Sequence, residues 1–442
     1  MSRFVSRAFI SALLLSQLFT AFPAAAQKLT ITPTVATGIY APGEKVAWSV
    51  AVDPSDPAPG AVGTVHYKIQ QAGNTVVAEG DLDLSKGAGM VAYQPAAADS
   101  YLLSIKTIVQ EKTTTFFGGA VAEPSKIGPS APRPVDFDEF WNKKIAALRA
   151  VPPNPIVTPG DSGIQGIAYE TVVLDNIEGA HVHAQIAYPQ NGTRLPAIIV
   201  MQWAGVYPLQ KAWATNQAKQ GWLAVNVMAH DLPIDQPKAF YDDLLATTLK
   251  DYVSIGNDDR DKSYFLKMIL GDVRIADYVA SRPEWDGKTM VASGTSQGGF
   301  QTLALTGLHP RITAALALVP AGCDQTAPLA GRAISWPYWL SRVQNGNDAK
   351  LKEACRYFDG VNFAHNIRVP LMIGAGWIDQ TSRPTGVLAA FNQATGPKEL
   401  VPLPLSDHQG HGNSQAPYYP RQQAWLSALK TGTTLDVRNA LK

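Results

Sequence analysis

Between residue 28 and about residue 121, apolar and polar side chains alternate along short runs such as Val65-His66-Tyr67-Lys68-Ile69. A period of two is typical of strands that bury one face. Turn-forming pairs such as Pro42-Gly43 and Lys86-Gly87 separate the runs. The predicted strands are Leu29–Thr34, Lys45–Val52, Val65–Gln70, Val76–Leu82, Met90–Tyr93, Tyr101–Gln110 and Thr113–Val121. Short strands at this spacing indicate a small all-β immunoglobulin-like sandwich, without the Cys-Trp-Cys signature of true immunoglobulin domains.

After residue 135 the pattern changes to apolar runs of strand length that alternate with segments of helical period. Strands covered on both faces of a mostly parallel sheet show such continuous apolar runs. The predicted strands are Tyr169–Leu174, Val182–Tyr188, Ala197–Met201, Trp222–Val227, Thr289–Ser293, Ala314–Leu318, Leu371–Ala375 and Glu399–Leu403. The first two are expected to pair as a hairpin. The predicted helices are Phe137 to about Ala150, Tyr264–Ala280, Phe300–Leu305, Pro384–Gln393 and Arg421–Lys430.

The clearest chemical signal is Gly294-Thr295-Ser296-Gln297-Gly298, between the predicted strand that ends at Ser293 and the predicted helix that begins at Phe300. Gly-x-Ser-x-Gly in this setting is a nucleophile elbow, in which a sharp turn presents the serine. A Cβ at either glycine would collide with the neighbouring strand or helix. A Gly/Ser-rich connecting turn is the alternative. With the order of elements above, the elbow predicts an α/β-hydrolase fold with Ser296 as nucleophile.

The other members of a catalytic triad are expected downstream, because serine, acid and histidine follow in that chain order in this fold. The predicted strand Leu371–Ala375 leads into Gly376-Trp377-Ile378-Asp379, and Asp379 is the candidate acid. His408 is the first histidine after the last predicted strand and is the candidate base, with His411 as the alternative base. Asp407 is disfavoured as the acid because neighbouring side chains tend to point apart.

An oxyanion hole needs two N–H groups near the nucleophile. The best candidates are the N–H of Gln297 and that of Trp203, which follows the third strand of the hydrolase sheet. The Trp203 indole is either the floor of a small acyl pocket or a core side chain. His181, His183 and His230 are candidate metal ligands. His181 and His183 alternate on one strand, but no nearby carboxylate or cysteine completes a tetrahedral set. Neither a metal nor an organic cofactor is expected.

The chain has 442 residues, more than one ordinary core holds, so at least two domains are expected. We predict the sandwich at residues 27–121, a proline-rich linker at 122–134 and the α/β-hydrolase domain at 135–442. Residues 1–26 have the features of a signal peptide: Arg3 and Arg7, then an apolar run, then Ala24-Ala25-Ala26. That run is too short to span a membrane. A cleaved export signal and a periplasmic or secreted protein are therefore expected.

Composition and net charge restrict the classes of substrate and binding partner that the protein can have. Hydrophobic content of 46% and charged content of 17% fit a globular enzyme. Loss of Arg3 and Arg7 with the signal changes the formal net charge from +1 to −1, which leaves no basic field for nucleic acid. A neutral polymer or small ester is expected as substrate, without membrane contact after signal cleavage. A disulfide between Cys323 and Cys355 is expected in an oxidising compartment, with two buried free thiols as the alternative.

Four separated motifs resemble the acetyl xylan esterase/cephalosporin-C deacetylase family over about residues 131–442: Phe137-Asp138-Glu139-Phe140-Trp141, Gly294-Thr295-Ser296-Gln297-Gly298-Gly299, Gly376-Trp377-Ile378-Asp379 and Asp407-His408-Gln409-Gly410. The resemblance implies a triad of Ser296, Asp379 and His408, with Trp203 at the oxyanion hole where the family usually has Tyr. It also implies removal of acetyl groups from sugar hydroxyls, as in acetylated xylan or xylo-oligosaccharides.

The chain departs from the family pattern in two places. Residues 226–231 replace an Arg-Gly-Gln motif, and Gln409 replaces a glutamate. These changes and the added β-domain indicate a divergent member. Two other functions remain as alternatives: a prolyl-oligopeptidase-like exopeptidase, and a hydrolase fold kept as a non-catalytic carbohydrate-binding protein. The sequence leaves the oligomeric state open, with an oligomer as one option.

Overall fold

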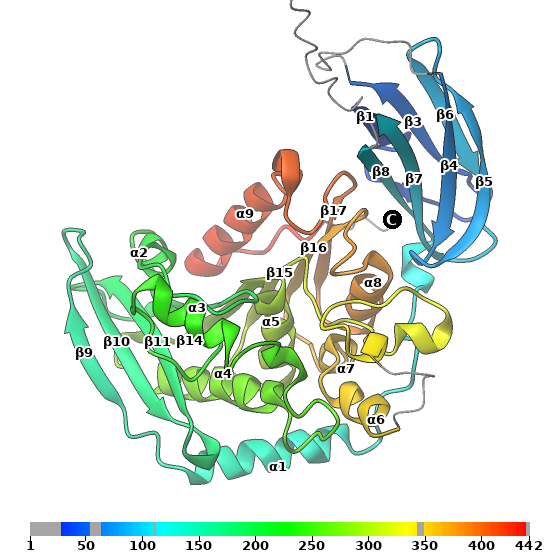
Figure 1. Ribbon diagram of the computed structural model, residues 1–442. Helices are drawn as coiled ribbons and strands as arrows, with labels where there is room; N and C mark the ends of the chain where they lie inside the picture. The colour runs from blue at the N-terminus through cyan, green and yellow to red at the C-terminus, as the bar shows by residue number, and fades with distance from the viewer. Residues whose placement is uncertain (1–27, 54–62, 110–111, 343–348, 439–442) are drawn as a thin grey trace, which may run out of the picture.

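The computed structural model describes residues 28–53, 63–109, 112–342 and 349–438 (Figure 1). The expected signal peptide, residues 1–26, lies outside these ranges. The first described part of the chain is all β. Its strands are β1 Leu29–Pro33, β2 Ile39–Tyr40, β3 Val46–Val52, β4 Thr64–Gln71, β5 Thr75–Asp83, β6 Ala88–Tyr93, β7 Asp99–Val109 and β8 Lys112–Ala122.

These strands form two sheets that enclose one apolar core. Strands β1, β3 and β6 make one antiparallel sheet, and the order of the other is β2-β8-β7-β4-β5. Trp48 and Val50 of the first sheet pack with Leu103 and Ile105 of the second, and all four are fully buried. The alternation in the sequence therefore predicted a sandwich correctly. It missed only β2, a short strand that pairs parallel with β8.

The second part of the chain is built on one large sheet. Among the described residues it contains nine strands in the order β17-β16-β15-β14-β12-β13-β11-β10-β9. Their bounds are β9 Ile156–Gly160, β10 Ile167–Asp175, β11 His181–Pro189, β12 Leu195–Met201, β13 Leu223–Val227, β14 Trp285–Thr295, β15 Ala314–Leu318, β16 Leu371–Gly376 and β17 Lys398–Leu403. From β13 through β17 the neighbours pair in parallel. The hairpin predicted from the sequence is β10 with β11. The unpredicted β9 is an exposed edge strand that contains a proline, so it carries no burial pattern.

Helices cover both faces of this sheet. They are α1 Phe137–Ala150, α2 Ala212–Ala218, α3 Lys238–Ala246, α4 Tyr264–Ser281, α5 Gln297–Leu308, α6 Ala349–Tyr357, α7 Gly360–Ala364, α8 Pro384–Gln393 and α9 Tyr418–Thr431. Successive residues of a strand face opposite sides. Thus Ile198 packs in the core with Trp425 of α9. Ile199 packs in the core with Phe265 of α4 and Phe300 of α5. This two-faced arrangement is the α/β-hydrolase fold that the sequence predicted.

The sandwich packs against the edge of the sheet that carries β16 and α8 (Figure 1). The indole of Trp377, just after β16, donates a hydrogen bond to the Thr37 carbonyl at 2.7 Å. The hydroxyls of Ser100 in β7 and Thr385 in α8 lie 2.7 Å apart, and Thr385 also donates to the Asp99 carboxylate at 2.8 Å. Across the described ranges, no helix is both long and apolar enough to cross a lipid bilayer.

The expected disulfide does not form: Cys323 and Cys355 are both free and buried. They belong to different core clusters, Cys323 with Ile373 and Cys355 with Trp141. Each thiol lies near a backbone carbonyl close in the chain, that of Ala321 or that of Lys352. Burial raises the pKa of both thiols. The alternative of two buried free thiols is therefore correct. A disulfide cannot form because the fold places Cys323 and Cys355 in separate core clusters.

Candidate active site

Ser296 stands at a strained turn between β14 and α5. Its backbone has φ 58° and ψ −120°, a conformation that residues other than glycine rarely adopt. The chain passes very close to itself on both sides of the serine. A Cβ at Gly294 would lie 2.3 Å from the Gly298 carbonyl oxygen, and one at Gly298 would lie 2.7 Å from that of Met201. The predicted elbow is therefore present, and Ser296 is partly exposed.

The three residues expected to form a triad meet at the C-terminal ends of three parallel strands. The Ser296 Oγ lies 2.7 Å from His408 Nε2, and His408 Nδ1 lies 2.8 Å from Asp379 Oδ2. Asp379 is 1% exposed. Its other oxygen accepts the N–H groups of Thr381 at 2.8 Å and Ser382 at 2.7 Å. A carboxylate beside Nδ1 holds the proton there, which leaves Nε2 to accept the serine hydroxyl.

The alternative base is not at this site. His411 Nδ1 lies 2.5 Å from Asp407 Oδ2, and the His411 side chain is 78% exposed. Asp407 thus contacts His411, and its side chain points away from His408 as expected for neighbouring residues. The backbone carbonyl of His408 accepts a hydrogen bond from Gln415 at 3.1 Å, which ties the base to the segment before α9.

The two candidate oxyanion donors lie on adjacent segments. Gln297 is the first residue of α5, where helix geometry leaves N–H groups without a carbonyl partner inside the helix. The loop that holds Trp203 follows β12, and Gln301 of α5 donates to the Gln202 carbonyl at 3.0 Å. The Trp203 indole is not a core side chain, since it is 44% exposed. It packs edge-on against Trp213, with ring centroids 4.7 Å apart.

A buried network that the sequence did not reveal supports this loop. The Tyr252 hydroxyl donates to Gln297 Oε1 at 2.5 Å and accepts the N–H of Gly205 at 3.3 Å. His230 Nε2 lies 2.9 Å from the Gly205 carbonyl, and its Nδ1 lies 2.7 Å from the Tyr264 hydroxyl. Burial lowers the pKa of His230 to about 4, so the ring is neutral at neutral pH and can donate at one nitrogen and accept at the other. The network joins the oxyanion loop to the start of α5.

His181 and His183 have a carboxylate beside them that the sequence analysis did not place there. Folding brings Asp231 to within 3.1 Å of His183 Nε2 and 3.6 Å of His181 Nδ1. The cause is the antiparallel pairing of β11 with β13, which places the segment after β13 beside the start of β11. Within the part of the chain that the structure describes, no three or more His, Cys, Asp or Glu residues are arranged to hold a metal ion.

The chain is similar in sequence to a known protein family and to a curated protein. Residues 123–428 match the family model described as acetyl xylan esterase (AXE1). The acetyl esterase Axe7A of Xylanibacter ruminicola is 30% identical over 292 residues, which cover 64% of this chain and 66% of that protein. The chain thus spans about two thirds of the length of this curated relative.

Two solved structures share the fold. The acetyl xylan esterase from Paenibacillus sp. R4 has 22% identity and a TM-score of 0.59, and the match covers 70% of this chain and 98% of that one. Acetyl xylan esterase 1 from Thermoanaerobacterium sp. JW/SL YS485 has 22% identity and a TM-score of 0.55, with 67% and 96% covered. Both matches therefore leave about a third of this chain uncovered.

Proposed function

The chain belongs to the acetyl xylan esterase family, as its four motifs predicted, and we propose that it is a serine esterase that removes acetyl groups from sugar hydroxyls. Acetylated xylan or xylo-oligosaccharides are the proposed substrates. The observation that carries the proposal is the 2.7 Å approach of Ser296 Oγ to His408 Nε2 with the buried Asp379 carboxylate behind the ring.

In the proposed reaction, Ser296 Oγ attacks the ester carbonyl while His408 takes its proton. Asp379 keeps the imidazole in the required tautomer and stabilises the imidazolium. The N–H groups of Gln297 and Trp203 hydrogen-bond the developing oxyanion. His408 then gives its proton to the departing sugar oxygen, and water, activated by the same imidazole, cleaves the acetyl-enzyme. The scheme needs neither a metal nor an organic cofactor.

The test compares the wild type with Ser296→Ala on acetylated xylo-oligosaccharides and on an aryl acetate. Loss of the nucleophile should lower kcat for both by roughly 10⁴-fold or more. Ser427→Ala, an exposed serine on α9, is the matched control and should retain wild-type rates. Acetate release by Ser296→Ala at the wild-type rate would refute the assignment. Turnover of aminoacyl-proline amides without acetate release would favour the exopeptidase alternative.

Export is a second part of the proposal. It is supported by the charged, apolar and small-residue pattern of residues 1–26. Expression of the full chain in a Gram-negative host followed by fractionation should place the protein in the periplasm, with Gln27 as its first residue by mass spectrometry. A cytoplasmic protein that retains Met1–Ala26 would contradict it.

A further inference from the structure

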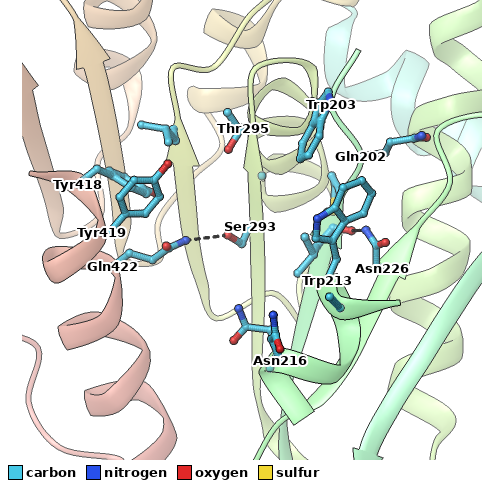
Figure 2. A pocket seen from close by; sticks show the side chains of 16 residues that line it. Gln202, Trp203, Trp213, Asn216, Asn226, Ser293, Thr295, Tyr418, Tyr419 and Gln422 are labelled. Carbon is cyan, nitrogen blue, oxygen red and sulfur yellow. Dashed lines mark hydrogen bonds between the residues drawn. The ribbon is translucent and has the colours of Figure 1, made fainter. Parts of the chain in front are cut away.

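A pocket lies between α2 and α9, on the face of the sheet opposite α4 and α5 (Figure 2). Its cavity has a volume of about 230 Å³. Ser293 and Thr295 of β14 line it from the sheet, and Thr295 directly precedes Ser296. Neither Ser296 nor His408 lines the pocket. The pocket is therefore separate from the nucleophile but begins one residue away from it.

Aromatic rings stand on two opposite sides of this pocket. Figure 2 shows Trp203 and Trp213 on one side and Tyr418 and Tyr419 on the other. Trp203 is 44% exposed and Tyr419 is 50% exposed, so both present ring surface to solvent. Large amphipathic rings with free faces suit ligands that have both apolar C–H faces and polar edges.

The rest of the lining combines apolar side chains, such as Val200 and Leu318, with polar side chains that carry no charge. None of the residues that line the pocket is Asp, Glu, Lys, Arg or His. The polar groups are amides and hydroxyls, including those of Asn216, Gln217 and Gln422. Such a lining offers no charge to balance a phosphate, a carboxylate or an ammonium group. It matches a neutral ligand rich in hydroxyl groups.

Two buried polar atoms in the lining have no hydrogen-bond partner among the described residues. They are the Tyr418 hydroxyl and Gln217 Oε1, and Tyr418 is only 1% exposed. By contrast, the Asn226 amide in the same lining donates to the Val200 carbonyl and accepts from Gln185. A buried polar group without a partner costs free energy, so a ligand that pairs with it gains affinity. Sugar hydroxyls can accept a hydrogen bond from the Tyr418 hydroxyl and donate one to Gln217 Oε1.

We propose that this pocket is a carbohydrate subsite, which binds a neutral pyranose ring of the substrate chain beside the ring whose acetyl group reacts at Ser296. The inference rests on the proposed esterase function and deepens it. Tyr419 and the Trp203–Trp213 pair stack on the sugar, and Tyr418 and Gln217 hydrogen-bond its hydroxyls. A long acetylated oligosaccharide therefore gains binding that a small aryl acetate does not.

The experiment compares kcat/KM for acetylated xylotetraose with kcat/KM for an aryl acetate in Gln217→Leu and Tyr419→Ala. The ratio of the two values should fall about tenfold in each variant, through KM for the oligosaccharide. Gln423→Leu is the matched control. Gln423 is exposed on α9, the helix that bears Tyr419, and does not line the pocket. The ratio for this variant should stay at the wild-type value. Melting curves identify any variant that fails to fold.

A second measurement separates this inference from the function it rests on. Calorimetric titration of the folded wild type with unacetylated xylotetraose should show binding that Tyr419→Ala weakens about tenfold. If the wild type releases acetate but both variants keep its substrate ratio, the subsite is refuted and the esterase stands. If the wild type releases no acetate, the proposed function fails. In that case binding of xylotetraose that Tyr419→Ala weakens would still support the subsite, and equal or absent binding would refute it.

Discussion

At the scale of single residues, the contacts of Asp379 determine which ring nitrogen of His408 carries the proton. One of its oxygens is fixed by two backbone N–H groups, so only the other is available to His408. Asp379→Asn keeps the shape but places an N–H₂ opposite Nδ1. The proton then moves to Nε2, and the ring can no longer accept from Ser296. We expect kcat for an aryl acetate to fall by about 10⁴-fold, the effect of this exchange in serine proteases.

Asp407→Asn is the control for that experiment. Asp407 pairs with the exposed His411 and not with His408. Its loss should change kcat less than about twofold, because exposed ion pairs contribute little. A larger loss of activity in Asp407→Asn than in Asp379→Asn would contradict the assignment of Asp379 as the acid that pairs with His408.

Asp272 on α4 gives a prediction about stability and pH. It is 1% exposed, and among the described residues neither of its oxygens has a partner. It shares a helix face with the buried Met268 and Ile275. Burial raises its pKa well above the usual value. The folded protein thus keeps a proton that the unfolded chain has released, and stability falls as pH rises above the ordinary pKa of an aspartate.

Asp272→Asn removes this pH-dependent cost without changing the shape of the side chain. We expect the variant to melt at a higher temperature than the wild type at pH 7 to 8. The difference should shrink as the pH falls and disappear below the ordinary pKa of an aspartate, where Asp272 is protonated in both the folded and the unfolded chain. Asp243→Asn, at an exposed position on α3, should follow the wild type at every pH. Equal melting temperatures of wild type and Asp272→Asn at pH 8 would contradict the prediction.

At the scale of elements, the start of α5 and the loop after β12 act as one unit because Tyr252 connects them. Its hydroxyl contacts both Gln297 and Gly205. Tyr252→Phe removes this link and leaves the N–H groups of the oxyanion hole less well positioned. We expect kcat to fall about tenfold with KM changed less than twofold, because the contact is needed most when charge develops on the ester oxygen.

Tyr278→Phe on α4 is the matched control for Tyr252→Phe. That hydroxyl accepts from Arg282 at 3.0 Å and is remote in sequence and contacts from the oxyanion loop. Steady-state kinetics on an aryl acetate should show wild-type kcat for this variant. If both substitutions lower kcat equally, or if Tyr252→Phe acts on KM alone, the link through Tyr252 does not position the donors.

The elements differ in how far sequence could predict them. Strands and the elbow were predicted because their signals are local: alternation, apolar runs, and glycines beside Ser296. Chain order was enough to propose His408 and Asp379. The sequence favoured a disulfide between Cys323 and Cys355 over two free thiols, because only the packed core shows that the two residues lie in different clusters. The role of Tyr252 could not be predicted from the sequence either. Its partners Gln297 and Gly205 come from distant segments, and no sequence motif indicates such contacts.

At the scale of the whole molecule, the sandwich packs directly against the hydrolase domain. It contacts the loop that bears Asp379, since Trp377 donates to the Thr37 carbonyl and packs directly on Gly119 of β8. A Cβ at Gly119 would lie 2.4 Å from Trp377 Cβ and 2.5 Å from its carbonyl carbon and oxygen. Backbone atoms cannot move aside as a flexible side chain can. Any side chain at position 119 must therefore push the sandwich and the acid loop apart.

Gly119→Ala should consequently affect both parts at once. We expect a loss of about 1–3 kcal/mol of stability, as for other overpacked sites, and a lower kcat because the displaced Trp377 is two residues from Asp379. Gly63→Ala is the control within the same sandwich, since a Cβ there meets no atom within 4 Å. Thermal melts of both variants test the predicted loss of stability, and aryl acetate kinetics test the predicted loss of kcat. A Gly119→Ala protein that melts lower yet keeps the wild-type kcat would show that the sandwich stabilises the enzyme without positioning its acid.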